Sequence, residues 1–191
     1  MTEGSDSHAS VTAQWARAVL DFWFKEIGER GWWAGTADGD AAVSARFLDL
    51  WEEKRDQPDA AFLNRADEAL AAVILFDQMP RHMFRGTARA FSTDILARDI
   101  AKGAVAQGYD IQIGGAGRLF FYMPFQHSEA LEDQETSLAF FQALGDGDAL
   151  AFAQKHHAII ARFGRFPHRN AALGRPCRPG EKAEIDENEP R

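Results

Sequence analysis

Apolar residues along this chain recur mostly at intervals of three and four, which is the spacing of an amphipathic α-helix. Valine, isoleucine and threonine, which favour strands, are sparse, whereas alanine, leucine and charged residues are plentiful. The pattern predicts about seven helices, at residues 11–27, 40–54, 65–78, 87–107, 118–123, 128–144 and 146–164, with a loop at residues 110–117. We therefore expect an all-α fold.

Glycine, proline and small polar residues mark the predicted helix ends. Gly145 and Gly164 follow the sixth and seventh helices, where a left-handed C-terminal cap is expected. Pro80 is expected to stop the third helix because proline lacks an N–H group, and Pro124 is expected to break the fifth. Ser128 is a suitable N-cap for the sixth helix.

The short connections between successive helices favour antiparallel helix pairs, stacked in an α-solenoid or packed in a compact bundle. The chain has no clean repeat period, so periodicity does not choose between the two. We expect a single helical domain at residues 11–176. A disordered N-terminus at 1–10 precedes it, and a charged, mobile tail at 177–191 follows it.

Composition restricts the classes of function. The 191 residues carry a net charge of −8, which argues against a nucleic-acid partner because phosphate binding depends on lysine and arginine. No apolar run is long enough to span a membrane, and the N-terminus lacks the features of a signal peptide. GxSxG, HExxH, Glu-x-x-His and P-loop sequences are absent, so no metal or cofactor is predicted. We expect a soluble cytoplasmic protein without a membrane partner.

Polar residues on apolar helix stripes are the main functional signal. Asp77 lies on the apolar stripe of the third predicted helix, in its last turn, where the helix dipole disfavours an anion. It therefore needs a cation, either Arg81 or an arginine of residues 162–169 (RFGRFPHR), in a structural ion pair or in the wall of a functional pocket. His156 shares a predicted stripe with Phe152, and is either a hydrogen-bonded core residue or a catalytic or ligand-binding one.

Two segments of opposite charge are natural partners. Residues 162–175 (RFGRFPHRNAALGR) contain four arginines, and residues 127–135 (HSEALEDQE) contain four carboxylates. The planar guanidinium of arginine suits bidentate pairing with a carboxylate. We expect residues 162–170 (RFGRFPHRN) to pack across the ends of the third and sixth helices and to pair with Asp77, Glu129 or Asp133.

Four stretches of the sequence resemble one bacterial family. They are VLDFWF (19–24), LFDQMPRHMFRGTARAFSTD (75–94), LFFYMPFQHSEALEDQE (119–135) and HHAIIARFGRFPHRNAALGR (156–175). Over residues 19–175 the chain is similar to the family known as domain of unknown function 924. This resemblance implies an all-helical fold with a tetratricopeptide-repeat-like superhelix of antiparallel helix pairs, and it implies no activity. Met79 and His82 stand where the family often has Phe and Asn.

These residues define a candidate site between the third, sixth and seventh predicted helices. The candidate catalytic residues are His127, His156, His168, Asp77 and Glu129, and the candidate ligand-binding residues are Arg81, Arg165, Arg169, Asp133, Asn170 and Gln78. We expect the site to bind or transform a small anionic molecule, and whether the protein is an enzyme is open. The alternatives are a tetratricopeptide-like scaffold for a protein or peptide partner, and an ion-paired clasp with a structural role alone.

Overall fold

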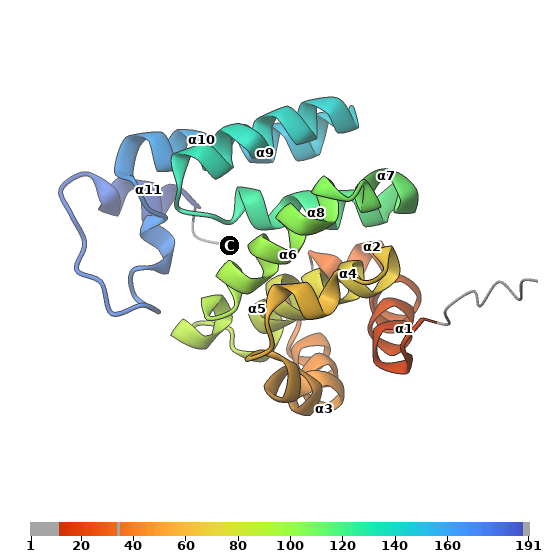
Figure 1. Ribbon diagram of the computed structural model, residues 1–191. Coiled ribbons are helices and arrows are strands. Elements are labelled where there is room, and N and C mark those ends of the chain that lie inside the picture. The colour runs from red at the N-terminus through yellow and green to blue at the C-terminus, as the bar shows by residue number, and fades with distance from the viewer. Residues whose placement is uncertain (1–11, 34, 189–191) are drawn as a thin grey trace, which may run out of the picture.

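The computed structural model describes residues 12–33 and 35–188, and all regular elements of these residues are helical (Figure 1). The prediction of an all-α fold is confirmed. The α-helices are α1 (Gln14–Asp21), α2 (Gly28–Trp32), α3 (Ala37–Lys54), α4 (Ala66–Val73), α5 (Met79–Met83), α6 (Asp94–Ala106), α7 (Tyr109–Ile113), α8 (Gly115–Gln126), α9 (Leu131–Leu144), α10 (Gly147–Phe163) and α11 (Glu181–Asn188). The N-terminus expected to be disordered, at 1–10, lies outside the described residues.

Shorter helical turns connect these helices. Two are π-helical, η1 (Phe22–Ile27) and η3 (Ile74–Gln78), and three are 3₁₀, η2 (Asp59–Phe62), η4 (Ala88–Phe91) and η5 (Pro167–Arg169). In the part of the chain that the structure describes, no helix is long and apolar enough to cross a membrane. A cytoplasmic location stays a prediction.

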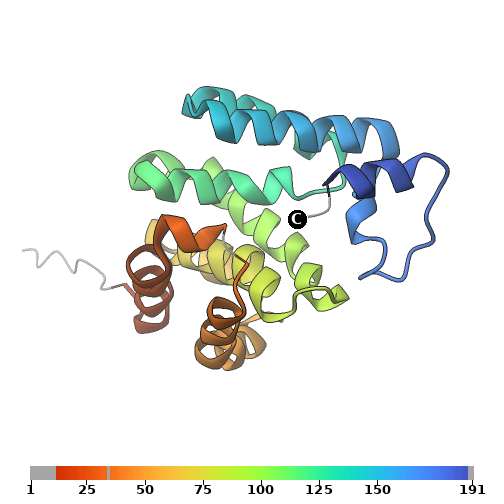
Figure 2. The same cartoon turned by 180° about the vertical axis from the view of Figure 1, so that it is seen from behind.

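The helices stack in layers, which Figures 1 and 2 show from opposite sides. The hairpin of α9 and α10 forms one outer layer, and α9 packs on α8. Beneath it, α8 packs on α4 and α6, and α4 in turn packs on α1. The helix α3 packs on α5 at the opposite side of the molecule from α9 and α10. The tetratricopeptide-like arrangement of these pairs stays a prediction.

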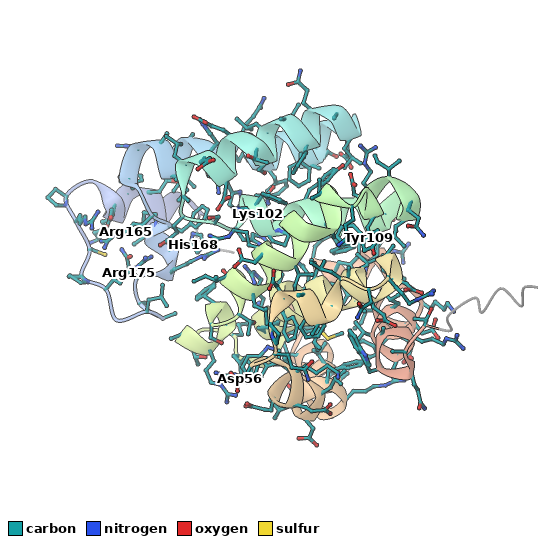
Figure 3. The ribbon with its side chains drawn as sticks, in the orientation of Figure 1. Asp56, Lys102, Tyr109, Arg165, His168 and Arg175 are labelled. Atoms are coloured by element: carbon teal, nitrogen blue, oxygen red, sulfur yellow. The ribbon has the colours of Figure 1, made fainter. Side chains whose placement is uncertain are left out.

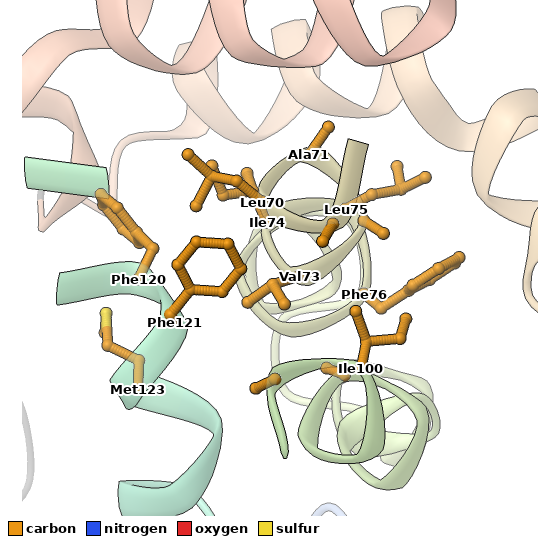
Figure 4. Packing of buried hydrophobic residues seen from close by; sticks show 14 of the residues in the cluster. Leu70, Ala71, Val73, Ile74, Leu75, Phe76, Ile100, Phe120, Phe121 and Met123 are labelled. Atoms are coloured by element: carbon orange, nitrogen blue, oxygen red, sulfur yellow. The ribbon is translucent and has the colours of Figure 1, made fainter. Parts of the chain in front are cut away.

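The core is centred on α4 and η3, which form one nearly continuous helix. All side chains of residues 69–78 are buried, so this helix is covered on every side and has no polar face. Figure 4 shows Phe121 of α8 against Val73, and Ile100 of α6 close to Phe76. A polar residue in this helix is therefore removed from water wherever it points, which is the situation of Asp77.

The predicted helix stop at Pro80 is wrong. The chain continues from the π-helical turn η3 directly into α5, and Pro80 lies in the first turn of α5. Proline cannot donate the hydrogen bond that the carbonyl of Phe76 would receive four residues earlier. The hydroxyl of Thr93 donates to that carbonyl instead, at 2.6 Å. A residue distant in sequence thus compensates for the proline.

Two other expected helix breaks are also absent from the structure. Pro124 lies inside α8, and the loop expected at 110–117 is helical, because α7 ends at Ile113 and α8 begins at Gly115. The helix expected at 87–107 is divided into the 3₁₀ turn η4 and α6. Gly114 of the GGAG stretch precedes α8, and Gly115 and Gly117 lie in its first turn.

The ends of the last two long helices are partly as predicted. Asp146 caps α10 by accepting from two backbone N–H groups at 3.0 Å, and Gly164 ends it with a φ of 66°. Ser128 is not the N-cap of α9, which begins at Leu131; its hydroxyl donates to Asp133 at 2.7 Å.

The buried face of α10 differs from the predicted stripe. Ala153 and Ile160 are buried, whereas Phe152 is 58% exposed and His156 is half-buried. The prediction followed the large aromatic residues, but the face turned to the core lies about 100° around the helix from Phe152.

The arginine-rich segment is attached to the C-terminal helix. The guanidinium of Arg165 contacts both carboxylate oxygens of Glu181, at 2.7 and 2.8 Å, and Asn170 donates to the same carboxylate at 3.0 Å. The Arg165 hydrogen bonds hold the pKa of Glu181 at about 2. Figure 3 shows Arg165 and Arg175 at the C-terminal end of the molecule. Part of the expected mobile tail is therefore a helix whose first residue, Glu181, is fully buried.

We expect Gly164→Ala to lower the free energy of unfolding by about 1 kcal/mol, because a side chain is strained at positive φ. A Cβ atom at Gly164 meets no neighbour within 4 Å, so the effect is one of backbone conformation alone. Gly147→Ala is the matched control, since Gly147 has equally open surroundings without a positive φ. Denaturant unfolding that ranks the two variants in the opposite order would contradict this prediction.

We expect Glu181→Gln to release α11 from the body of the protein, because it leaves the buried guanidinium of Arg165 without its counter-charge. Amide hydrogen exchange in residues 181–185 should accelerate by about tenfold or more, with exchange in α4 unchanged. Lys182→Gln, at an exposed position of the same helix, should leave exchange as in the native protein. Unaltered protection of α11 in Glu181→Gln would show that the pair is dispensable.

Candidate functional site

A histidine held by a buried carboxylate forms the centre of the candidate site. Nδ1 of His127, the residue that follows α8, lies 2.8 and 2.9 Å from the two carboxylate oxygens of Asp77. Asp77 is fully buried. Because Nδ1 donates to the carboxylate, Nε2 of the neutral ring is the proton acceptor. Among residues 12–33 and 35–188, no group forms a hydrogen bond with this Nε2.

Arg81 keeps Asp77 ionised. Its Nη2 lies 3.4 Å from a carboxylate oxygen of Asp77, and its Nη1 donates to the backbone carbonyl of Asp77. Burial favours the neutral acid, but the charges of Arg81 and His127 outweigh it and hold the pKa of Asp77 at about 2. Burial lowers the pKa of His127 below its usual 6.5, and Asp77 opposes this shift without cancelling it. At pH 7 the pair is therefore a carboxylate beside a neutral imidazole.

Asp94 joins this pair to the arginine-rich segment. Arg81 contacts its two carboxylate oxygens at 3.1 and 3.3 Å, and Arg169 contacts one of them at 3.0 Å. The guanidinium of Arg169 lies between two phenylalanine rings, 4.5 and 4.7 Å from their centres. It also donates to the backbone carbonyl of His127 at 3.0 Å. Arg169 thus positions His127 by binding its backbone carbonyl.

His127, Arg81 and Gln78 line a cavity of about 640 Å³. Its walls come from α2, from η3 with α5, from α8, and from α9 with the first half of α10. The apolar lining consists of Trp32, Trp33, Leu119, Met123, Phe141, Ala149 and Phe152. This volume is within the usual range for sites that enclose a small molecule.

Two amides lie beside His127 in the cavity wall. Gln126 is only 6% exposed, and its side chain forms no hydrogen bond with any described residue. Gln78 donates to Asp77 and lies 3.6 Å from the sulfur of Met123, so its amide oxygen is not used in these contacts. Buried amides normally have hydrogen-bond partners. Their position suits them to a polar group of a molecule in the cavity.

A second histidine lines the same cavity. Nδ1 of His82 lies 2.9 Å from Asp40, and Arg85 binds the same carboxylate at 2.7 and 2.8 Å. Burial lowers the pKa of His82, and Asp40 opposes this only in part. In the described part of the chain, no three His, Cys, Asp or Glu side chains are grouped as a metal ion would require. Because the pKa values of both His127 and His82 are lowered, the cavity presents two neutral imidazoles at pH 7.

Six of the sequence-predicted site residues lie in or directly behind the cavity wall. Gln78, Arg81 and His127 line it, and Asp77 and Arg169 support them. The sixth is His156, whose ring centre lies 6.4 Å from that of His127 and whose Nδ1 donates to a backbone carbonyl at 2.9 Å. Burial lowers the pKa of His156 to about 4, so that this ring is also neutral at pH 7.

Of the two cations predicted as alternatives for Asp77, the structure brings Arg81, and neither Asp77 nor Asp133 pairs with the arginine-rich segment. Asp77 is paired with Arg81, and Asp133 contacts Lys102 at 2.7 Å and Arg98 at 3.3 Å, beside a smaller cavity of about 310 Å³. Asp77 thus receives its cation from α5, and Asp133 receives its cations from α6. Glu129 accepts a hydrogen bond from the backbone N–H of Phe166 in this segment at 2.7 Å, but its ion pair is with Arg175, beyond residues 162–170, at 2.7 and 3.0 Å.

The other predicted residues lie away from the cavity. Arg165 and Asn170 contact Glu181, as described above, and hold α11 in place. His168 is exposed, and its ring packs against Phe166 at 5.4 Å between ring centres (Figure 3). Of the four residues of 162–175 that were predicted to act at the site, only Arg169 reaches it.

Sequence reasoning did not predict five residues of the site: Asp40, His82, Arg85, Asp94 and Gln126. Asp40 and Asp94 lie in the first turns of α3 and α6, where an acid is explained by the helix dipole alone. Gln126 directly precedes His127 in the quoted stretch 119–135, and His82, Arg85 and Asp94 lie in the quoted stretch 75–94, so membership of these stretches was the available signal.

Comparisons with known proteins define the family of the chain. A solved structure of a protein of unknown function from Agrobacterium tumefaciens is 37% identical, covers 91% of this chain and 97% of its own, and has a TM-score of 0.82. No curated protein matches the sequence. The family described as bacterial protein of unknown function (DUF924) matches residues 19–189. The chain therefore belongs to the DUF924 family, as its motifs predicted.

Proposed function

We propose that the cavity is an acid–base site for a small molecule, with His127 as the proton acceptor. One observation carries the proposal: a neutral imidazole is oriented by a fully buried carboxylate, inside a cavity of about 640 Å³. A histidine held in this way acts as a general base or as a nucleophile through Nε2. The carboxylate of Asp77 stabilises the imidazolium that forms when Nε2 takes up a proton.

The neighbouring residues have distinct roles in this proposal. Arg81 and Arg169 are positioning residues, since Arg81 holds Asp77 and Arg169 holds the backbone of His127. Gln78 and Gln126 lie where they can bind a neutral polar group of the substrate, next to the reacting nitrogen. Trp32 and Phe141 enclose its apolar part.

The anionic ligand expected from the sequence stays a prediction, and the ion pairs weigh against it. Arg81 and Arg169 share Asp94, and Arg81 also contacts Asp77. Arg85, the other arginine in the cavity wall, is bound by Asp40 through two hydrogen bonds. Three guanidinium groups therefore face three carboxylates, and among the described residues of the site no arginine is left without a carboxylate to bind a ligand.

The alternative of a protein- or peptide-binding scaffold requires exposed polar residues along an open groove. Asp77 and Arg169 are instead at least nine-tenths buried, and His127 is 11% exposed at a cavity wall. Burial of ionisable groups around a cavity is typical of small-molecule chemistry. We therefore place a small-molecule site ahead of a scaffold.

The small neutral ester p-nitrophenyl acetate tests the reactivity of His127. We expect His127→Gln to lower its hydrolysis by about tenfold or more, because the variant lacks the activated imidazole. His157→Gln is the matched control, since His157 is a half-buried histidine of α10 that does not line the cavity. With both variants folded by circular dichroism, equal rates for His127→Gln and the native protein would exclude the proposed role.

The pH dependence follows from the lowered pKa of His127. The folded protein binds this proton less readily than the unfolded chain, so both the reactive neutral ring and its contribution to stability are lost as pH falls below 6.5. We expect an NMR titration of the His127 ring with a midpoint below 6.5. The facing charged groups are Asp77, Arg81 and Asp94.

Asp77→Asn removes the charge that opposes this shift, so the midpoint should fall further. A midpoint at or above 6.5 in the native protein, or a higher midpoint in Asp77→Asn, would contradict this account of the pair.

A further inference from the structure

The mouth of the cavity is aromatic. Trp33, at the end of α2, is 59% exposed, and Phe152 of α10 is 58% exposed. Both line the cavity that contains His127. Large apolar side chains that lie exposed at the opening of a concave site are typical of ligand contacts.

The same mouth carries negative charge. Glu29 of α2, together with Asp146 and Asp148 at the start of α10, also lines the cavity. The side chains of Glu29 and Asp148 form no salt bridge or hydrogen bond with any described residue. One carboxylate oxygen of Asp146 accepts the two backbone hydrogen bonds that cap α10. The arginines of the cavity do not offset these acids, because each is already paired with Asp40, Asp77 or Asp94. The ammonium of Lys155 lies 5.5 Å from the centre of the Phe152 ring, so the face of that ring is occupied, but Lys155 does not line the cavity.

The interior beyond this mouth is neutral and polar. His127 and His82 are neutral at pH 7, and Gln126 is nine-tenths buried with an amide that no described residue binds. The unpaired amide of Gln126 therefore indicates a ligand in the cavity, and this observation does not depend on the charge at the mouth. A complementary molecule has a positive charge at one end and a neutral hydrogen-bonding group at the other.

We infer that the cavity takes a small organic cation, with its ammonium group at the mouth against Trp33 and its neutral polar group beside Gln126 and His127. Aromatic faces attract cations, most strongly alkylated ammonium groups, and the carboxylates at the mouth add a Coulombic attraction. The inference rests on the proposed function, because it names the class of substrate for the same site.

Three probes of similar size separate charge from shape. They are choline, its neutral carbon analogue 3,3-dimethyl-1-butanol, and the anion 3,3-dimethylbutyrate. Binding is followed by NMR through the indole N–H signals of Trp32 and Trp33, assigned with a Trp33→Phe variant. We expect choline to shift the Trp33 signal and to bind about fivefold or more tightly than the neutral analogue. The anion should bind more weakly than either.

Charge variants locate the effect at the mouth. Asp148→Asn should weaken choline binding by about threefold or more and leave binding of the neutral analogue unchanged. Asp56→Asn is the matched control, since Asp56 is an exposed acid that does not line the cavity and lies on a different side of the molecule (Figure 3). It should alter neither probe.

Equal affinities for choline and its neutral analogue would overturn the inference, as would an absence of choline binding. Tighter binding of 3,3-dimethylbutyrate would overturn it in favour of the anionic class. None of these results bears on the proposed role of His127, which fails if His127→Gln hydrolyses the ester as fast as the native protein. The two failures are therefore distinguishable.

Discussion

The ionised carboxylate of Asp77, placed in a helix that is covered on every side, is the constraint on which the centre of this molecule depends. A buried charge without partners destabilises a fold by several kcal/mol, so the chain folds only if cations and hydrogen-bond donors reach this point. Arg81 reaches it from α5 and His127 from the end of α8. The contact that satisfies the carboxylate also orients the imidazole, so the stability of the core and the geometry of the site have the same cause.

The same requirement extends outward through Asp94 to Arg169. Two guanidinium groups that share one carboxylate repel each other, and burial together with the charge of Arg81 lowers the pKa of Arg169 to about 10 despite the attraction of Asp94. Arg169 still carries its charge at pH 7, held between two aromatic rings and bound to the backbone of His127. A segment more than forty residues beyond His127 thus supports the site from behind without entering the cavity.

The structural features that depend on residues close together in the chain are the ones that the sequence predicts well. The helical class, the cap at Asp146 and the end at Gly164 follow from local patterns, and so does the need of Asp77 for a cation. The continuation of the helix through Pro80 could not be predicted from the sequence. It depends on the hydroxyl of Thr93, which tertiary packing brings to the carbonyl of Phe76, seventeen residues away. Which cation each acid receives, and that His82 shares the cavity of His127, are likewise settled by tertiary packing.

The charge of a ligand is governed by the groups that folding leaves unpaired, and these differ from the groups that dominate the sequence. Residues 162–175 are rich in arginine, yet Arg165, Arg169 and Arg175 each contact a carboxylate of another segment. At the cavity mouth the imbalance has the opposite sign, since Glu29 and Asp148 have no cationic partner among the described residues. Long-range attraction depends on net local charge, so an arginine-rich motif and a cation-binding cavity are compatible in one small protein.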